Sequence, residues 1–155
     1  MTTRDEALRA IELASGELIQ RANRAHLYTE LIRASGLDID QAVFLVFSCV
    51  GRIGPARVAD VATAVGIGPT TSSRHLTTLE RLGVVRRAPD PSDGRAAMVA
   101  LTPAGQQSFA AARSANARLL GALVADWTED ELADFADYFK RFTEALISRG
   151  STAID

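Results

Sequence analysis

The stretch Val84–Thr102, VVRRAPDPSDGRAAMVALT, predicts two short strands joined by a polar turn. β-Branched residues open the stretch and an apolar run closes it, as is typical of paired strands. Between them, Pro89–Gly94 concentrates the residue types that favour turns. Arg86 and Arg87 stand at the base of this hairpin and Arg95 stands near its tip. The sequence therefore predicts a basic β-hairpin.

Two helices are expected directly before the hairpin. Ala56–Val65 has apolar residues at helical spacing, and Gly66 permits the left-handed backbone of a sharp turn. The second helix is expected over Pro69–Leu82, with the proline in its first turn and Gly83 as its stop. Helix, turn, helix and basic hairpin in this order are typical of a winged-helix DNA-binding module.

The second of these helices divides into an apolar and a polar face. At 100° per residue, Leu76, Leu79 and position 72 share the buried side. The polar side carries short hydroxyl side chains and arginines, which suit base edges and phosphates in a major groove. We expect DNA contacts from this helix at Thr70, Thr71, Ser73, Arg74, Thr77, Thr78 and Arg81, and from the hairpin at Arg86, Arg87 and Arg95.

Helices are also expected before this region. One long helix is predicted from Arg4 to about Arg33, because no proline interrupts its apolar spacing. Another begins near Asp38 or Asp40 and runs through AVFLVFSCV, which is apolar on nearly every side. This second helix is predicted to be the most buried element of the fold.

Two further helices are expected after the hairpin. Thr102 is predicted to cap a helix that runs to about Ala125, and Thr128 with Glu131 has the spacing of a capping box for the last one. The last helix has apolar residues alternating by three and four, the pattern of a helix that packs lengthwise on a partner. The dimerisation residues predicted from the first and last helices are Leu8, Ile11, Leu132, Phe135, Phe139, Phe142 and Leu146.

Composition indicates a globular protein. The 155 residues suit one domain, and no apolar run approaches the length of a membrane span. The net charge of −2 is unevenly distributed, since residues 55–102 hold six arginines and four acids whereas Asp126–Asp137 holds six acids and no base. A single cysteine, Cys49, suits a reducing compartment, and the N-terminus lacks a signal peptide's apolar centre. We expect a cytoplasmic protein with no membrane partner.

Catalytic and metal-binding patterns are missing from the sequence. There is no glycine-rich phosphate loop and no nucleophile elbow, so we expect neither an enzyme nor a cofactor. His26 and His75 have no partner at metal-ligand spacing, which predicts that the chain binds no metal.

The sequence resembles the MarR family of bacterial transcription regulators over nearly its whole length. The wing motif stands as Asp93-Gly94-Arg95 followed by Val99–Gly105, and the recognition-helix motifs stand as Ser73–Leu76 and Leu79–Gly83. The resemblance implies a mainly α fold with a small β-wing, and a homodimer held by helices from both termini. It places dimerisation helices at 1–35 and 103–150 and a winged helix-turn-helix lobe at 38–102, within one domain of 1–155.

The resemblance also implies a function. Family members bind pseudo-palindromic operators in double-stranded DNA, and many are repressors that a small, often phenolic, ligand releases. The recognition helix would enter the major groove, Arg95 the minor groove, and Asp93 would brace that arginine. Polar candidates for the ligand pocket are His26, Tyr28 and Arg52.

Two positions depart from the family pattern. The family often has a second arginine where this chain has Gly94, and a branched apolar residue where it has Ser72. We expect the Ser72 hydroxyl to donate to a helix carbonyl, at some cost in packing.

Two other functions fit the same scaffold. A thiol-based regulator would use Cys49 as its redox switch, which requires an accessible cysteine of low pKa. A protein-interaction module would leave the basic face dispensable. We favour the ligand-responsive repressor.

Overall fold

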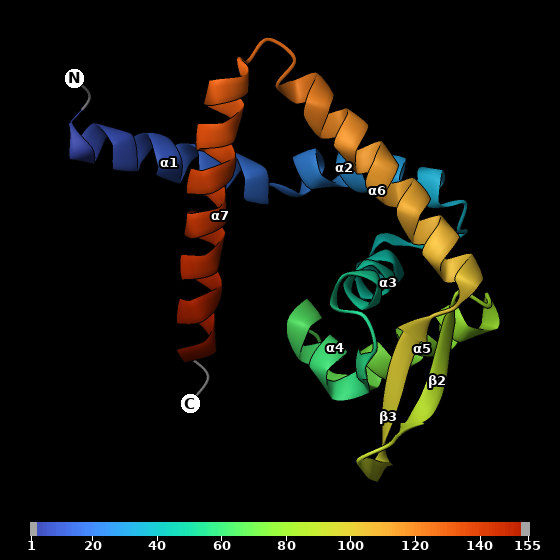
Figure 1. Cartoon of the computed structure of the whole chain (residues 1–155). Helices are drawn as coiled ribbons and strands as arrows, with labels where there is room; N and C mark the ends of the chain where they lie inside the picture. The colour runs from blue at the N-terminus through green and yellow to red at the C-terminus, as the bar shows by residue number, and fades with distance from the viewer. Residues whose placement is uncertain (1–2, 153–155) are drawn as a thin grey trace. The chain divides into compact units, whose positions relative to one another are not determined.

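The computed structural model describes residues 3–152, without the side chains of residues 19, 21–24, 94–95 and 149–152. Its elements are α1 (Arg4–Ile19), α2 (Arg21–Ser35), α3 (Gln41–Ile53), β1 (Ala56–Arg57), α4 (Val58–Val65), α5 (Pro69–Arg81), β2 (Val85–Asp90), β3 (Asp93–Leu101), α6 (Pro103–Leu123) and α7 (Glu129–Thr152). The chain divides into two compact units, residues 1–116 and residues 117–155. The fold is mainly helical with one small antiparallel sheet, as predicted (Figure 1).

Helix α3 supplies the centre of the first unit. Val46, Phe47 and Val50 have no exposed surface, which confirms that the AVFLVFSCV helix is strongly buried. Asp40 caps the helix, since its Oδ1 accepts a hydrogen bond from the Val43 N–H at 2.9 Å. The ring of Phe47 meets Phe109 of α6 edge to face, with centroids 6.2 Å apart.

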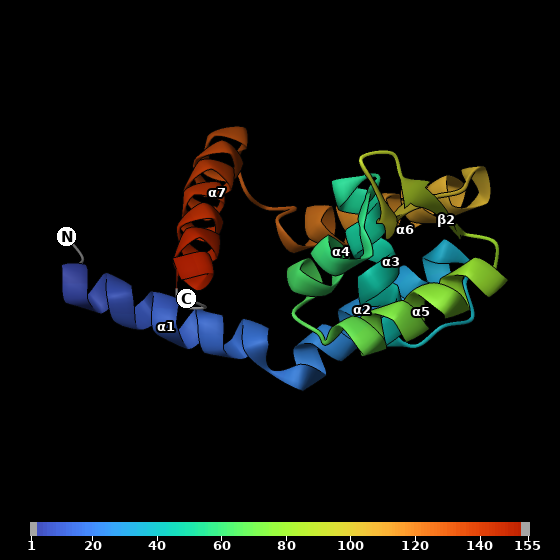
Figure 2. The ribbon, with the colours of Figure 1, turned by 90° about the horizontal axis from the view of Figure 1, so that it is seen from below.

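Helices α4 and α5 form the predicted helix-turn-helix, and α3 packs against both (Figure 2). Gly66 ends α4 with a φ of 74°, a left-handed conformation that glycine adopts without strain. Pro69 is the first residue of α5, where its missing N–H costs nothing. Leu76 and Leu79 are fully buried, so α5 presents its opposite face outward.

Ser72 does not make the predicted hydrogen bond to a helix carbonyl. Its side chain is fully buried, and its Oγ has no hydrogen-bond partner among the residues described. Ser72 lies on the same buried face of α5 as Leu76 and Leu79. The apolar side chains around this face provide no hydrogen-bond acceptor. An unpaired hydroxyl in such a place reduces stability.

A third strand, absent from the sequence prediction, precedes α4. Ala56 and Arg57 were expected to be helical, but they pair with Val99 and Met98 of β3 in the sheet order β1-β3-β2. The predicted helix therefore begins two residues late, at Val58. Two residues carry too little pattern to predict a strand, because the partner strand lies far along the chain.

The hairpin strands are longer than predicted. Pro89–Gly94 was expected to be a turn, but β2 continues to Asp90 and β3 already begins at Asp93. The pairing of Asp90 with Asp93 follows a register shift at Pro89/Asp90, so the ladder is irregular near the tip of the hairpin. In Figure 1 the β2–β3 hairpin projects from the lobe of α3, α4 and α5.

The single helix predicted over Arg4–Arg33 is interrupted at Gln20. This residue has a ψ of 131°, which ends α1, and its N–H caps the carbonyls of Gly16 and Glu17. Within the first unit, α2 packs on the core through side chains such as Leu31, whereas Leu8 of α1 is half exposed. The two helices therefore differ in burial, a difference that apolar spacing alone did not predict.

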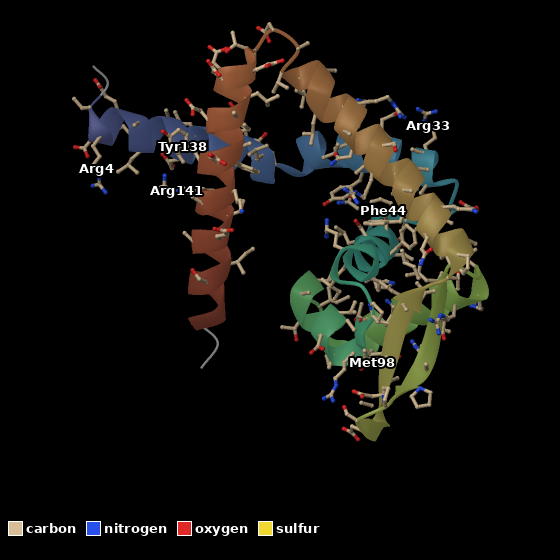
Figure 3. The ribbon with its side chains drawn as sticks, viewed as in Figure 1. Arg4, Arg33, Phe44, Met98, Tyr138 and Arg141 are labelled. Atoms are coloured by element: carbon tan, nitrogen blue, oxygen red, sulfur yellow. The ribbon has the colours of Figure 1, made fainter. Side chains whose placement is uncertain are left out.

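The second unit contains the end of α6 and helix α7. Thr128 and Glu131 form the predicted capping box, because the Thr128 Oγ1 accepts from the Glu131 N–H while the Glu131 carboxylate accepts from the Thr128 N–H. Phe135 lies between the rings of Trp127 and Phe139, with centroids 5.2 and 5.5 Å away. In Figure 3, Arg141 lies over the ring of Tyr138. No helix in the described part of the chain is both long enough and apolar enough to cross a membrane.

Candidate nucleic-acid interface

The outward face of α5 gathers most of the hydroxyl and guanidinium groups predicted from the sequence. Its exposed members are Thr70, Arg74, Thr77 and Arg81, while Thr71, Ser73 and Thr78 are partly buried. The Thr77 and Thr78 hydroxyls donate to the carbonyls of Ser73 and Arg74, at 3.0 and 3.3 Å. Their oxygen lone pairs remain available, so this surface combines hydrogen-bond acceptors with cationic donors.

The two arginines at the base of the hairpin lie in different environments. Arg86 is exposed, whereas Arg87 is partly buried and directs its guanidinium to α5. Neighbouring residues of a strand point to opposite faces, which explains the difference. Sequence reasoning treated the two as equivalent, because both belong to one basic run.

The tip of the hairpin holds the remaining predicted residues. Position 95 belongs to β3, but the side chain of Arg95 lies outside the described residues, as does position 94. Asp93 is exposed and begins the same strand. Minor-groove contact by Arg95 and its support by Asp93 therefore stay predictions.

An ion pair that the sequence analysis missed fixes the hairpin near its tip. The Arg57 Nε donates to Asp90 Oδ2 at 2.7 Å, and the N–H and hydroxyl of Ser92 donate to Asp90 Oδ1 at 2.8 and 2.7 Å. These Ser92 bonds, and then Arg57, hold the pKa of Asp90 below its ordinary value, although burial opposes them. The Asp-Pro-Ser order at 90–92 was a signal for this turn, but nothing in the sequence linked it to Arg57.

A pocket of about 300 Å³ lies in the first unit, among α2, α3 and α6. Tyr28 and Arg52 line it as predicted, whereas His26 is not among its lining residues. Phe44, on the side of α3 that faces α6, forms part of its apolar wall (Figure 3). Arg113 adds a second guanidinium, and none of the described residues that line the pocket carries a carboxylate, so the charged groups there are cationic.

Cys49 lacks the environment that a redox switch requires. Its side chain is buried in the core around α3. Burial raises the pKa of its thiol, and nearby Arg52 lowers it by less. Both observations disfavour a reactive thiolate. Across the described residues, no cluster of histidine, cysteine and carboxylate side chains could hold a metal ion.

Comparison with known proteins assigns this arrangement to a family. Residues 39–97, from the start of α3 into β3, match the model of the MarR family. Over this stretch the chain is similar to the MarR family. The match covers the helix-turn-helix and most of the hairpin. MarR proteins are transcription regulators rather than enzymes.

Relatives extend the similarity beyond that domain. The chain is 26% identical over 137 residues to the uncharacterised HTH-type transcriptional regulator YxaD of Bacillus subtilis, covering 88% of this chain and 95% of the relative. The crystal structure of MarR is 25% identical with a TM-score of 0.70, covering 88% of this chain and 93% of that one. The regulator PcaV of Streptomyces coelicolor, solved with its natural ligand, is 24% identical with a TM-score of 0.58, covering 84% and 92% of the two chains. The MarR fold therefore continues beyond the matched domain into the flanking helices.

Proposed function

We propose that the chain is a dimeric, sequence-specific DNA-binding transcription regulator, and a repressor that a small ligand releases from its operator. The observation that carries this proposal is the outward face of α5, where Arg74 and several hydroxyl groups stand exposed beside a basic hairpin. Helix α5 is the right element to enter a major groove, since its opposite face is fully buried in the lobe.

Each DNA-facing group has its own role in the proposal. Arg74 reads a base edge or clamps a phosphate from the middle of α5, with Thr70, Thr77 and Arg81 beside it. Arg86 holds a phosphate, and Arg95 enters the narrow minor groove, where negative potential is concentrated.

A homodimer presents two such faces. Five apolar side chains of α1 and α7 predicted to lie in the interface are between 43% and 64% exposed in the single chain: Leu8, Ile11, Leu132, Phe139 and Leu146. Covering them with a second copy across a two-fold axis buries this area. The operator is then pseudo-palindromic, with half-sites about 10 bp apart, one turn of DNA.

The ligand in this proposal is a small aromatic anion. The pocket offers aromatic walls from Tyr28, Phe44 and Phe109. It also offers two guanidiniums, with no carboxylate among the lining residues that the structure describes. Calorimetric titration with benzoate, and with neutral benzamide as the matched control, tests the charge preference. Two results would contradict the proposed charge preference. One is equal affinity for benzoate and benzamide, and the other is an Arg52→Ala variant that loses affinity for neither compound.

The test of DNA binding begins with selection of duplexes from a random library by the full chain. Fluorescence anisotropy then compares the selected duplex with an unrelated one across a salt series. Arg74→Ala should lose about 1–3 kcal/mol on the selected duplex and much less on the other. Arg95→Ala should weaken both duplexes by similar factors and flatten the salt dependence by about one counterion.

Other outcomes identify the competing functions. A chain that enriches no duplex is not a sequence-specific regulator, and the interaction-module hypothesis then gains support. If a thiol oxidant dissociates the wild-type complex but not that of Cys49→Ala, the redox hypothesis replaces the ligand-responsive one.

A further inference from the structure

Among the predicted DNA-contacting arginines whose side chains are described, Arg87 differs from the others because its guanidinium is engaged within the lobe. Its Nη2 donates to the backbone carbonyl of Ser73 at 2.9 Å and lies 3.5 Å from the Ser73 Oγ. Its Nε lies 3.4 Å from the Glu80 Oε2, an ion-pair contact in which the Nε makes no hydrogen bond among the described residues. Only 28% of the Arg87 side chain is exposed. One side chain of β2 therefore touches α5 at two points.

The spacing of those two points matters. Ser73 and Glu80 are seven residues apart, about two turns of helix, so both lie on the side of α5 that faces β2. The buried Leu76 and Leu79 already orient α5, and two contacts with one planar guanidinium further restrain its rotation relative to β2. Arg74 follows Ser73 directly, at about 100° around the helix. The clamp therefore restrains the direction in which Arg74 points.

We infer that Arg87 is a positioning residue that holds the recognition helix in its reading orientation, and is not itself a phosphate contact. This inference rests on the proposed DNA-binding function. Ser73 belongs to the same clamp, since its carbonyl and hydroxyl face Arg87. Glu80 completes it, although a carboxylate beside a DNA-binding surface repels phosphate. Glu80 therefore acts by its ion pair with Arg87 and not by contact with DNA.

The matched pair Arg87→Ala and Arg86→Ala tests the inference, because each variant removes one positive charge from adjacent positions of β2. Anisotropy is measured on the duplex selected by the wild type and on an unrelated duplex, across a salt series. For Arg87→Ala we expect a loss of about tenfold on the selected duplex, less than about twofold on the other, and an unchanged salt slope. For Arg86→Ala we expect equal losses on both duplexes and a slope lower by about one.

Glu80→Gln provides a test of opposite sign. Simple electrostatics predicts tighter binding to both duplexes when this negative charge is removed. The clamp predicts weaker binding to the selected duplex. It predicts no further loss when Glu80→Gln is added to Arg87→Ala, since Arg87→Ala alone already removes both contacts. Arg87→Lys should fall between wild type and Arg87→Ala, because an ammonium cannot span both points.

The outcomes separate this inference from the proposed function. If the wild type selects no duplex, the DNA-binding proposal fails. If it selects one, but Arg87→Ala lowers the salt slope as Arg86→Ala does, or Glu80→Gln strengthens binding to both duplexes, Arg87 is a phosphate contact and the clamp is wrong. Circular dichroism checks folding, and should Arg87→Ala not fold, Glu80→Gln and Arg87→Lys decide.

Discussion

Ser72 and Gly105 show how single atoms limit the stability of the lobe. Ser72 places a hydroxyl without a described partner on the fully buried face of α5. Gly105, in the first turn of α6, lies so close to the chain just before β2 that an added Cβ would clash with the Val84 carbonyl oxygen. Ser72 therefore carries a hydroxyl oxygen that its surroundings do not pair, whereas Gly105 has no space for a Cβ.

Ser72→Ala should stabilise the protein by about 1 kcal/mol. The change removes an unpaired buried hydroxyl without enlarging the side chain, and alanine is also the better helix former. Urea unfolding at a fixed protein concentration measures the difference. Lower stability would mean that the hydroxyl has a partner, such as a bound water.

Gly105→Ala should destabilise the protein by about 3 kcal/mol or more. The obstacle is backbone, which cannot move aside as a flexible side chain does. Gly121→Ala is the matched control in the same helix, since a Cβ there meets nothing within 4 Å. The control should be neutral or gain up to about 1 kcal/mol. Similar effects of both changes would contradict the packing argument.

At the scale of elements, local patterns predicted structure well where the pattern lay within the element. The α4–Gly66–α5 motif and the caps at Asp40, Thr102 and Thr128 follow from short-range chemistry. Strand β1 does not, because only pairing with β3 makes its two residues a strand.

The candidate site follows the same rule. The exposed face of α5 was predictable from helical periodicity, with Arg74 at its middle. The orientation of Arg87 depends on Ser73, and the anchor of Asp90 depends on Arg57, 33 residues away. Helical periodicity cannot predict these contacts between elements. It shows which face of its own element a residue occupies, but not which residue of another element packs against it.

The stability contributed by the Arg57–Asp90 ion pair should decrease at acid pH. The pKa of Asp90 is lowered in the folded chain, so its contribution to stability is present above the unfolded pKa and is lost as pH falls through the folded value. Asp90→Asn should therefore be less stable than wild type at pH 7, and the gap should narrow as the pH falls below about 4. Urea unfolding at several pH values measures it. A gap that stays constant with pH would show that the charge of Asp90 contributes nothing.

At the scale of the whole molecule, the apolar surface of α7 supports the proposed dimer. Phe135, Phe139 and Phe142 are each exposed by 45% to 47% in the single chain. Large exposed aromatic side chains at helical spacing mark an interaction surface. Dimerisation accounts for them without invoking a ligand.

Phe139→Asp with Phe142→Asp should dissociate or unfold the protein, because two charges would have to be buried in the interface. Sedimentation equilibrium gives the oligomeric state, and circular dichroism gives the folding. Tyr138→Ser on the same helix is the control, since this ring is 63% exposed and lies outside the predicted seam. A folded double mutant that remains a DNA-binding dimer would exclude this surface as the interface.

The pocket among α2, α3 and α6 shares its wall with the core that supports α5. Phe109 lines the pocket, touches Phe47 at the centre of α3, and lies so close to Gly51 that a Cβ there would stand 2.6 Å from its ring. Any occupant that shifts this ring acts on the packing beneath the recognition helix. The two binding equilibria are then coupled. If the occupant lowers the affinity of the protein for DNA about tenfold, DNA must lower the affinity of the protein for the occupant by the same factor.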